Sequence, residues 1–137
     1  MAVISELIRE EENGALSFGN YELKEKTKQD GFKYNGDSYK IKTFYEITKL
    51  EKNGAFVYES VPGTAVHDFR ANATKTIFSV EGDKDAQITL ELEPEKEYKV
   101  HVNDVYVGKM KTNLGGKLNL SVELEENDQV NVVIEKI

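Results

Sequence analysis

The stretch that decides the fold is Glu97-Tyr-Lys-Val-His-Val102, which is followed by Asn103-Asp104 and Val105-Tyr-Val107. Apolar and polar residues alternate in its first segment, and they alternate again in Lys117-Leu-Asn-Leu-Ser-Val-Glu-Leu124. A period of two residues is typical of strands with one buried face. A polar loop of two residues between two such strands predicts a tight hairpin.

The turns also predict a strand register. The loop Asn103-Asp104 sets Val100 opposite Val107. If Asn113-Leu-Gly-Gly116 closes a second hairpin, Val107 also lies opposite Val122. Both registers place the valines on the same face of a sheet. We therefore expect Val100, Val107 and Val122 to be buried together.

The rest of the chain repeats this pattern of short alternating segments, which are separated by Gly, Asn, Asp and Pro. Such spacing predicts an all-β fold, an antiparallel β-sandwich or flattened barrel of about 10–12 short strands with little or no helix. The length of 137 residues fits one domain. Within residues 1–137 we expect two β lobes, about 1–72 and 73–137, which share one core.

The N-terminal segment, residues 2–9, fits either a strand or a short helix. Its apolar residues have a helical spacing, but Asn13-Gly14 follows and leads into a second apolar run. Asn-Gly between two apolar runs favours a hairpin, and hence a strand. A strand at this position could also pair with the sheet edge of a neighbouring molecule.

A second ambiguous segment is Ser38 to Leu50, which alternates throughout. Thirteen residues exceed the usual length of a strand. We expect one long strand with a bend or bulge near Thr43 to Tyr45. A register drawn through the next turn, Glu51-Lys-Asn-Gly54, sets Tyr58 opposite Ile47.

Composition narrows the classes of partner. The formal net charge of −7 argues against nucleic acid and against anionic membrane surfaces, both of which require a basic patch. No segment is apolar enough for a membrane span, and the first residues lack the basic region of a signal peptide. The chain has no cysteine, which is compatible with a reducing compartment. We expect the protein in the cytoplasm.

Residues for catalysis are few. His67 and Asp68 are adjacent, but a Ser-His-Asp triad requires mutual hydrogen-bonding geometry that adjacency does not supply. Glu46 and Glu59 are candidates for an acidic pair that hydrolyses a glycoside. These four are weak candidates, and the sequence favours a protein that is not an enzyme. No motif indicates a cofactor or a metal site.

Aromatic residues are a stronger indication of function. Tyr39, Tyr45 and Tyr58 lie in the first half of the chain, where aromatic residues are concentrated. Tyrosines on a sheet face can stack on sugar rings or anchor a protein partner. The alternative is that these tyrosines belong to the hydrophobic core.

Four segments resemble a family of short bacterial proteins that has carried the label endosialidase. They are Gly19-Asn-Tyr-Glu-Leu23, Lys49-Leu-Glu-Lys-Asn-Gly54, Phe56-Val-Tyr-Glu-Ser-Val-Pro-Gly-Thr-Ala-Val66 and Val107-Gly-Lys-Met-Lys-Thr-Asn-Leu-Gly-Gly-Lys-Leu118. The resemblance spans nearly the whole chain. It implies activity on sialic acid polymers and assigns no catalytic residue.

From the residues themselves we expect a non-catalytic β-sandwich that acts by binding or assembly, through a protein partner or through self-assembly at strand edges. The first alternative is a carbohydrate-binding module that uses Tyr39, Tyr45 and Tyr58. The second is a glycan hydrolase of the endosialidase type that uses Glu46 and Glu59.

Overall fold

The computed structural model describes residues 3–124 and 129–137, and these residues form β-strands and their connections without a helix. The strands are β1 (Ile8–Glu10), β2 (Leu16–Phe18), β3 (Thr27–Tyr34), β4 (Asp37–Phe44), β5 (Ile47–Lys52), β6 (Ala55–Val61), β7 (Ala65–Ala71), β8 (Lys75–Glu81), β9 (Ala86–Glu91), β10 (Glu97–Val102), β11 (Val105–Lys111), β12 (Lys117–Val122) and β13 (Val130–Lys136). The expected all-β fold is confirmed.

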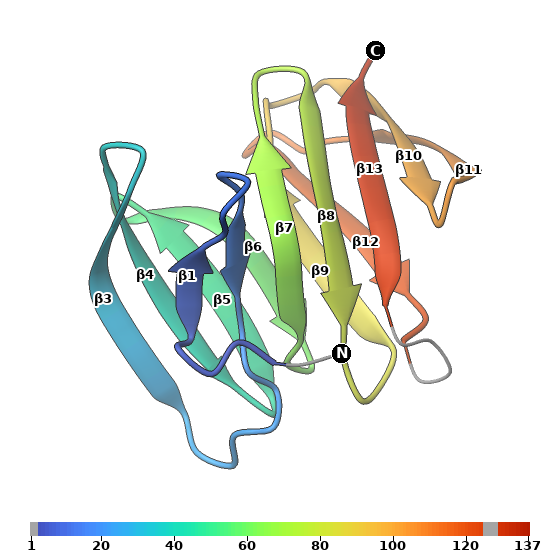
Figure 1. Cartoon of the computed structure of the whole chain (residues 1–137). Coiled ribbons are helices and arrows are strands. Elements are labelled where there is room, and N and C mark those ends of the chain that lie inside the picture. The colour runs from blue at the N-terminus through green and yellow to red at the C-terminus, as the bar shows by residue number, and fades with distance from the viewer. Residues whose placement is uncertain (1–2, 125–128) are drawn as a thin grey trace.

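Two antiparallel sheets pack face to face (Figure 1). One has seven strands in the order β1-β2-β7-β8-β13-β10-β11, and the other has six in the order β12-β9-β6-β5-β4-β3. Both sheets are open, so the observed architecture is the predicted sandwich and not the barrel. Each sheet draws strands from 1–72 and from 73–137, because β6 pairs with β9 and β7 pairs with β8. A single hydrophobic core lies between the sheets.

Alternation along the strands builds this core. On β9, Ala86, Ile88 and Leu90 are buried while Gln87 is exposed. Strands of the opposite sheet supply side chains such as Phe78 to the same cluster. Because a strand turns alternate side chains to opposite faces, each sheet offers one apolar face to the other.

Buried hydroxyl groups join the two sheets where the chain passes from β6 to β7. The Oγ1 atom of Thr64 lies 2.8 Å from Tyr58 Oη and 2.7 Å from Ser60 Oγ. Thr48 Oγ1 donates to the Thr64 carbonyl at 2.8 Å, accepts from the Thr64 N–H at 3.1 Å and lies 2.8 Å from Thr43 Oγ1. All five residues are fully buried. We call this set, Thr43, Thr48, Tyr58, Ser60 and Thr64, the Thr64 cluster.

Two glycines let the backbone approach the Thr64 cluster closely. A Cβ atom on Gly19 would clash with the carbonyl oxygen of Thr64, and one on Gly63 would clash with that of Phe44. Gly19 also has a φ of +102°, which residues with side chains rarely adopt. The segment that contains Gly19 therefore packs directly on the backbone at Thr64, and the segment that contains Gly63 packs directly on the backbone at Phe44.

The hairpin at Asn103-Asp104 is confirmed, since Val102 pairs with Val105, but the register beyond it is wrong. A bulge after Val100 sets that residue opposite Gly108 instead of Val107. Val100 is fully buried, whereas Val107 is 51% exposed.

The expected second hairpin is also wrong, because β11 and β12 lie in different sheets. Val122 is buried, but it pairs with Ala86 of β9. The connection that leads from β11 to β12 is held near the β9–β10 loop by a hydrogen bond from the Leu92 N–H to the Gly116 carbonyl at 2.7 Å. A Cβ atom on Gly116 would clash with the Leu92 carbonyl, so only glycine permits this approach.

The segment from Ser38 to Leu50 forms two strands, β4 and β5, and not one bent strand. The chain reverses at Tyr45, whose N–H donates to the Leu23 carbonyl at 2.9 Å and whose carbonyl accepts from the Gly63 N–H at 3.0 Å. The expected register with β6 is also wrong, because Tyr58 lies opposite Leu50 and not Ile47.

The N-terminal segment contains a short strand and no helix in its described part, residues 3–9. β1 pairs with β2 around Asn13-Gly14, as the Asn-Gly pattern predicts. Ile4 and Ile8 are buried, so this segment packs on its own molecule.

The Thr64 cluster should be a main determinant of stability. Replacing Thr64 by valine keeps the shape but removes the hydroxyl that Tyr58 and Ser60 contact in the core. We expect the free energy of unfolding to fall by about 1–3 kcal/mol, the cost of leaving buried polar groups without a partner. Urea denaturation of Thr64→Val measures this change. The exposed Thr74→Val is the control, with an expected change within about 0.5 kcal/mol; equal effects of the two substitutions would contradict the role of the cluster.

Candidate functional site

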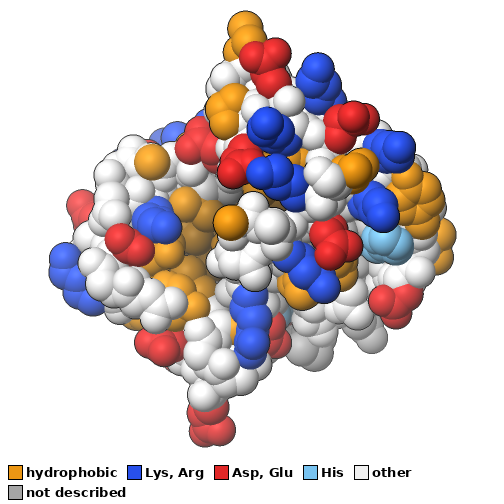
Figure 2. Space-filling view, turned by 90° about the horizontal axis from the view of Figure 1, so that it is seen from above, with side chains coloured by type: hydrophobic (Ala, Val, Ile, Leu, Met, Phe, Trp, Pro, Cys, Tyr) orange, Lys and Arg blue, Asp and Glu red, His pale blue; other side chains and the backbone are white. Residues whose placement is uncertain are grey.

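A groove of about 610 Å³ opens between the two sheets at the end that carries the β3–β4, β5–β6, β7–β8 and β9–β10 connections. We call it the end groove. Seen from above in Figure 2, this end of the molecule is hollowed, with hydrophobic side chains inside and charged side chains around them. Clefts of this size that are mainly apolar, with a few polar groups, are typical of ligand sites.

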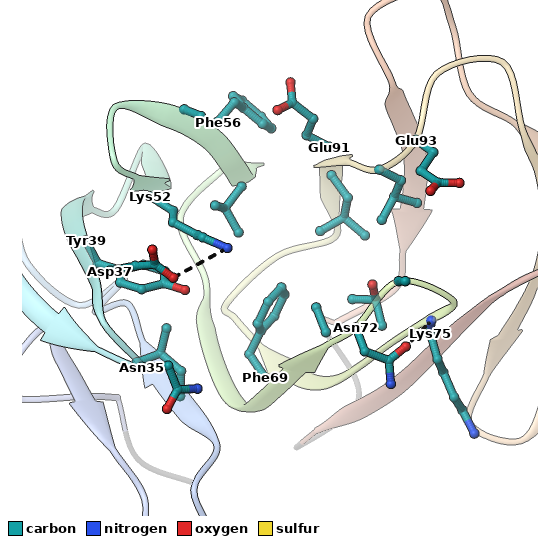
Figure 3. A pocket seen from close by; sticks show the side chains of 18 of the residues that line it. Asn35, Asp37, Tyr39, Lys52, Phe56, Phe69, Asn72, Lys75, Glu91 and Glu93 are labelled. Carbon is teal, nitrogen blue, oxygen red and sulfur yellow. Dashed lines mark hydrogen bonds and ion pairs between the residues drawn. The ribbon is translucent and has the colours of Figure 1, made fainter.

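Five aromatic side chains from both sheets line the end groove: Tyr34, Tyr39, Phe56, Phe69 and Tyr98. Phe56 comes from β6 and Phe69 from β7, and they lie across the groove from each other (Figure 3). Tyr34 and Tyr39 contact edge to face, with ring centroids 5.7 Å apart. Tyr34 and Phe56 are half-buried, whereas Tyr39, Phe69 and Tyr98 belong to the core, with 8%, 9% and 3% of their surfaces exposed. The ring surface open to a ligand therefore comes mainly from Tyr34 and Phe56 of the six-stranded sheet.

The rim of the end groove is polar and nearly balanced in charge. Lys52 Nζ lies 3.7 Å from Asp37 Oδ2, the ion pair drawn in Figure 3. Glu91 and Glu93 also border the groove, and each pairs with a lysine, Lys117 and Lys136 respectively. Because these carboxylates are already neutralised, the rim suits a ligand that offers hydroxyl groups instead of a high charge.

Tyr39 keeps a neutral phenol in this setting. Burial raises the pKa of Tyr39, and the negative charge of Asp37 raises it further. The hydroxyl group therefore remains a hydrogen-bond donor over the physiological pH range.

Phe56 contacts a lysine. Lys117 Nζ lies 4.0 Å from the centroid of the Phe56 ring, a cation–π contact that helps to hold the ring in place.

The three tyrosines expected to bind a ligand do not share one surface. Tyr39 borders the end groove, but Tyr58 is fully buried in the Thr64 cluster, and burial raises its pKa. Tyr45 is 52% exposed and borders a separate hollow of about 430 Å³ with Tyr21 and Pro62. That hollow lies at the opposite end of β4 and β5 from the end groove.

The acidic candidates are also separated. Glu46 is exposed at the β4–β5 turn and borders the hollow near Tyr45. Glu59 is half-buried on β6, pairs in register with Lys49 and borders neither that hollow nor the end groove. The structure therefore does not bring Glu46 and Glu59 into a common cleft.

His67 and Asp68 do not form a pair. His67 is buried, and its Nε2 atom lies 2.9 Å from Glu81 Oε1 on the neighbouring strand β8. Asp68 is exposed, has a φ of +56° at a bulge and accepts a hydrogen bond from Asn13.

Sequence reasoning did not find Phe56, Phe69 and Tyr98 as site residues. Two aromatic residues of the groove stand beside an Asn-Gly turn, namely Tyr34 before Asn35-Gly36 and Phe56 after Asn53-Gly54. That position at a strand end was the available indication. No sequence pattern indicated that Phe69 and Tyr98 would reach the same end of the molecule, because that depends on how distant strands pair in space.

Comparisons with known proteins add no functional assignment. No family model, no curated protein and no solved structure matches the chain. The resemblance to the proteins labelled endosialidase therefore stays a prediction. Residues 3–124 and 129–137 contain no helix that could cross a membrane and no cluster of acidic or histidine side chains that could hold a metal ion.

The contact between His67 and Glu81 should contribute to stability. The substitution His67→Ala leaves the buried Glu81 carboxylate without this partner, which should cost about 1–3 kcal/mol. The control is His101→Ala, which removes a ring on the outer face of β10 that contacts Tyr106 and should cost less than about 1 kcal/mol. Thermal or urea denaturation compares the two, and a smaller effect at His67 than at His101 would contradict this assignment.

Proposed function

We propose that the protein is a non-catalytic binding module whose ligand occupies the end groove. The observation that carries this proposal is an open groove between the sheets that is lined by aromatic side chains, of which Tyr34 and Phe56 are half-buried. Such surfaces bind ring-shaped or apolar groups well, because an aromatic side chain offers a large contact area with few rotatable bonds.

The ligand class that the groove favours is carbohydrate. A sugar ring has an apolar face that packs on aromatic rings and hydroxyl groups that require polar partners at the edge. The end groove has the ring of Phe56 on one wall, and Asn35 borders its opening. The side chains of Asn53 and Asn72 also border it, but they hydrogen-bond within the protein. For the carbohydrate-binding alternative named from the sequence we thus propose the end groove as the site. Of the three tyrosines predicted from the sequence, Tyr39 alone borders it, as a largely buried side chain.

A non-catalytic role agrees with the placement of the acidic residues. Glycoside hydrolysis requires two carboxyl groups on either side of the scissile bond. The carboxylates at the end groove, Asp37, Glu91 and Glu93, each have a lysine partner. The proposed compartment is the cytoplasm, and it is supported by the cysteine-free composition alone.

Titration with a panel of neutral and sialylated oligosaccharides, followed by calorimetry or NMR, tests this proposal. Phe56→Ala removes one wall of the groove at a half-buried position, so we expect the fold to persist and the affinity to fall by about tenfold or more. Tyr45→Ala is the matched control at the opposite end of the sandwich, and its affinity should equal that of the unchanged protein.

Two results would overturn the proposal. One is the absence of binding by a folded sample at millimolar ligand across the panel. The other is binding that Phe56→Ala leaves unchanged. Circular dichroism of each variant confirms that a loss of binding does not arise from unfolding.

A further inference from the structure

Three lysines stand in one row across the six-stranded sheet. Lys28 of β3 lies opposite Lys42 of β4, and Lys42 lies opposite Lys49 of β5. These three strands are neighbours at one end of the sheet (Figure 1). We call Lys28, Lys42 and Lys49 the lysine row. Like charges that face each other on adjacent strands destabilise a sheet, so the fold keeps the row together against the repulsion of its charges.

The lysine row lies on the outer face of the sheet. Ile41 and Thr43 flank Lys42 along β4, and both are fully buried. Because successive side chains of a strand point to opposite faces, Lys42 points away from the core. Lys28 and Lys49 share this orientation, since residues that lie opposite each other on neighbouring strands are on the same face.

The lysine row has no salt-bridge partner among the residues that the structure describes. Partial burial lowers the pKa of Lys42, and the charges of Lys26 and of the two other members of the row lower it further. Lys26 is thus a fourth positive charge close to the row. The chain as a whole has a formal net charge of −7. The pairing of three strands therefore gathers positive charge at one place on an acidic protein.

The surroundings of the lysine row limit the size of a ligand. On β6 the row is continued by Glu59. Along the strands, the half-buried Phe44 and Ile47 lie on one side of the row. On the other side Lys40 lies opposite Glu51, so positive charge faces negative charge there. A long polyanion laid across the sheet would meet the carboxylate of Glu59, whereas a compact anion would contact the lysines alone.

Linked phosphate groups match the charge of the lysine row. Neighbouring members lie about 5 Å apart at Cβ, less than the Debye length of about 8 Å at physiological salt, so dissolved ions screen their repulsion only in part. A carboxylate carries one negative charge, whereas a phosphate monoester carries about −1.5 to −2 at neutral pH. Lysine binds phosphate as a point charge, and the row has no arginine, whose planar fork suits carboxylates. Adjacent phosphate groups therefore supply the required charge in a small volume.

We propose that the lysine row is a binding site for a compact ligand that carries two or more linked phosphate groups. Lys42 contacts the ligand at its centre, and Lys28 and Lys49 contact it from either side. Binding offsets the repulsion within the row, and it stabilises the folded chain because only the folded sheet brings the three lysines together. None of the three lines the end groove, so this proposal does not rest on the proposed carbohydrate site.

Calorimetric titration of the full chain with sodium tripolyphosphate tests the proposal. At about 0.15 M salt we expect a dissociation constant of about 1 mM or lower. Lys42→Gln removes the central charge and should weaken binding by about tenfold or more. Lys99→Gln is the matched control, because it removes the same charge from an exposed position of β10 in the other sheet. The control should bind about as tightly as the unchanged protein.

Thermal unfolding is a second measurement. We expect tripolyphosphate to raise the unfolding temperature of the unchanged protein and of Lys99→Gln, but not that of Lys42→Gln. Replacing Lys42 removes a repulsive charge and breaks no salt bridge of the described chain. The unfolding temperature of Lys42→Gln without ligand should therefore not fall, so a loss of binding does not arise from unfolding.

Other anions test the choice of ligand. ATP carries its linked phosphate groups on a nucleoside, so a higher affinity for ATP than for tripolyphosphate would identify the ligand as a nucleotide. A higher affinity for tripolyphosphate would identify it as inorganic. Citrate offers carboxylates in place of phosphate groups, and it should bind at least about tenfold more weakly than tripolyphosphate.

The proposal is overturned if the unchanged protein does not bind tripolyphosphate at about 10 mM. It is also overturned if Lys42→Gln and Lys99→Gln bind equally well, or if citrate binds as tightly as tripolyphosphate. Tighter binding of a short DNA duplex would assign this surface to nucleic acid and reject the compact ligand.

Discussion

The structure depends on the buried hydroxyl groups around Thr64, where the chain leaves one sheet and enters the other. Thr48 belongs to β5 and Tyr58 to β6, and both contact Thr64 just before β7 begins. No buried side-chain polar atom in the described ranges lacks a hydrogen-bond partner. A satisfied polar network in a core favours one geometry strongly, because any displacement leaves polar groups unpaired. The two sheets are therefore joined firmly at this end of the sandwich.

The end groove lies at the other end of the same strands. Tyr58 belongs to the Thr64 cluster, while Phe56, two residues earlier on β6, lines the groove. The side chains of the Thr64 cluster are joined by hydrogen bonds between hydroxyl groups, whereas aromatic rings line the open end. The strand β6 thus contributes Tyr58 to the hydrogen bonds at one end of the sandwich and Phe56 to the wall of the end groove at the other. Rigid strands hold ligand-contacting side chains more accurately than loops do.

The sequence predicted local structure well and strand neighbours poorly. The bounds of β10 and β11 agree with the alternating pattern, since a two-residue turn joins strands that are adjacent in the chain. The pairing of β12 with β9 was missed because it depends on the contact between Gly116 and Leu92, which no local pattern encodes. The same holds for the candidate site. Tyr39 was predicted from the alternating pattern of its own strand, whereas Phe69 and Tyr98 reach the groove only because distant segments pair in the sheet.

The position of β13 has a consequence for how the molecule is made. This strand comes after β12 in the sequence, yet it lies inside the seven-stranded sheet, between β8 and β10 (Figure 1). β8 and the β10–β11 hairpin are joined in the sheet only through β13, so their facing edges stay unpaired until β13 has folded between them. Contacts between residues far apart in sequence slow folding, because the entropy of closing the intervening loop is lost first. The sheet is thus completed by insertion of an interior strand, and a partly folded chain in which β13 is not yet in place exposes two sheet edges.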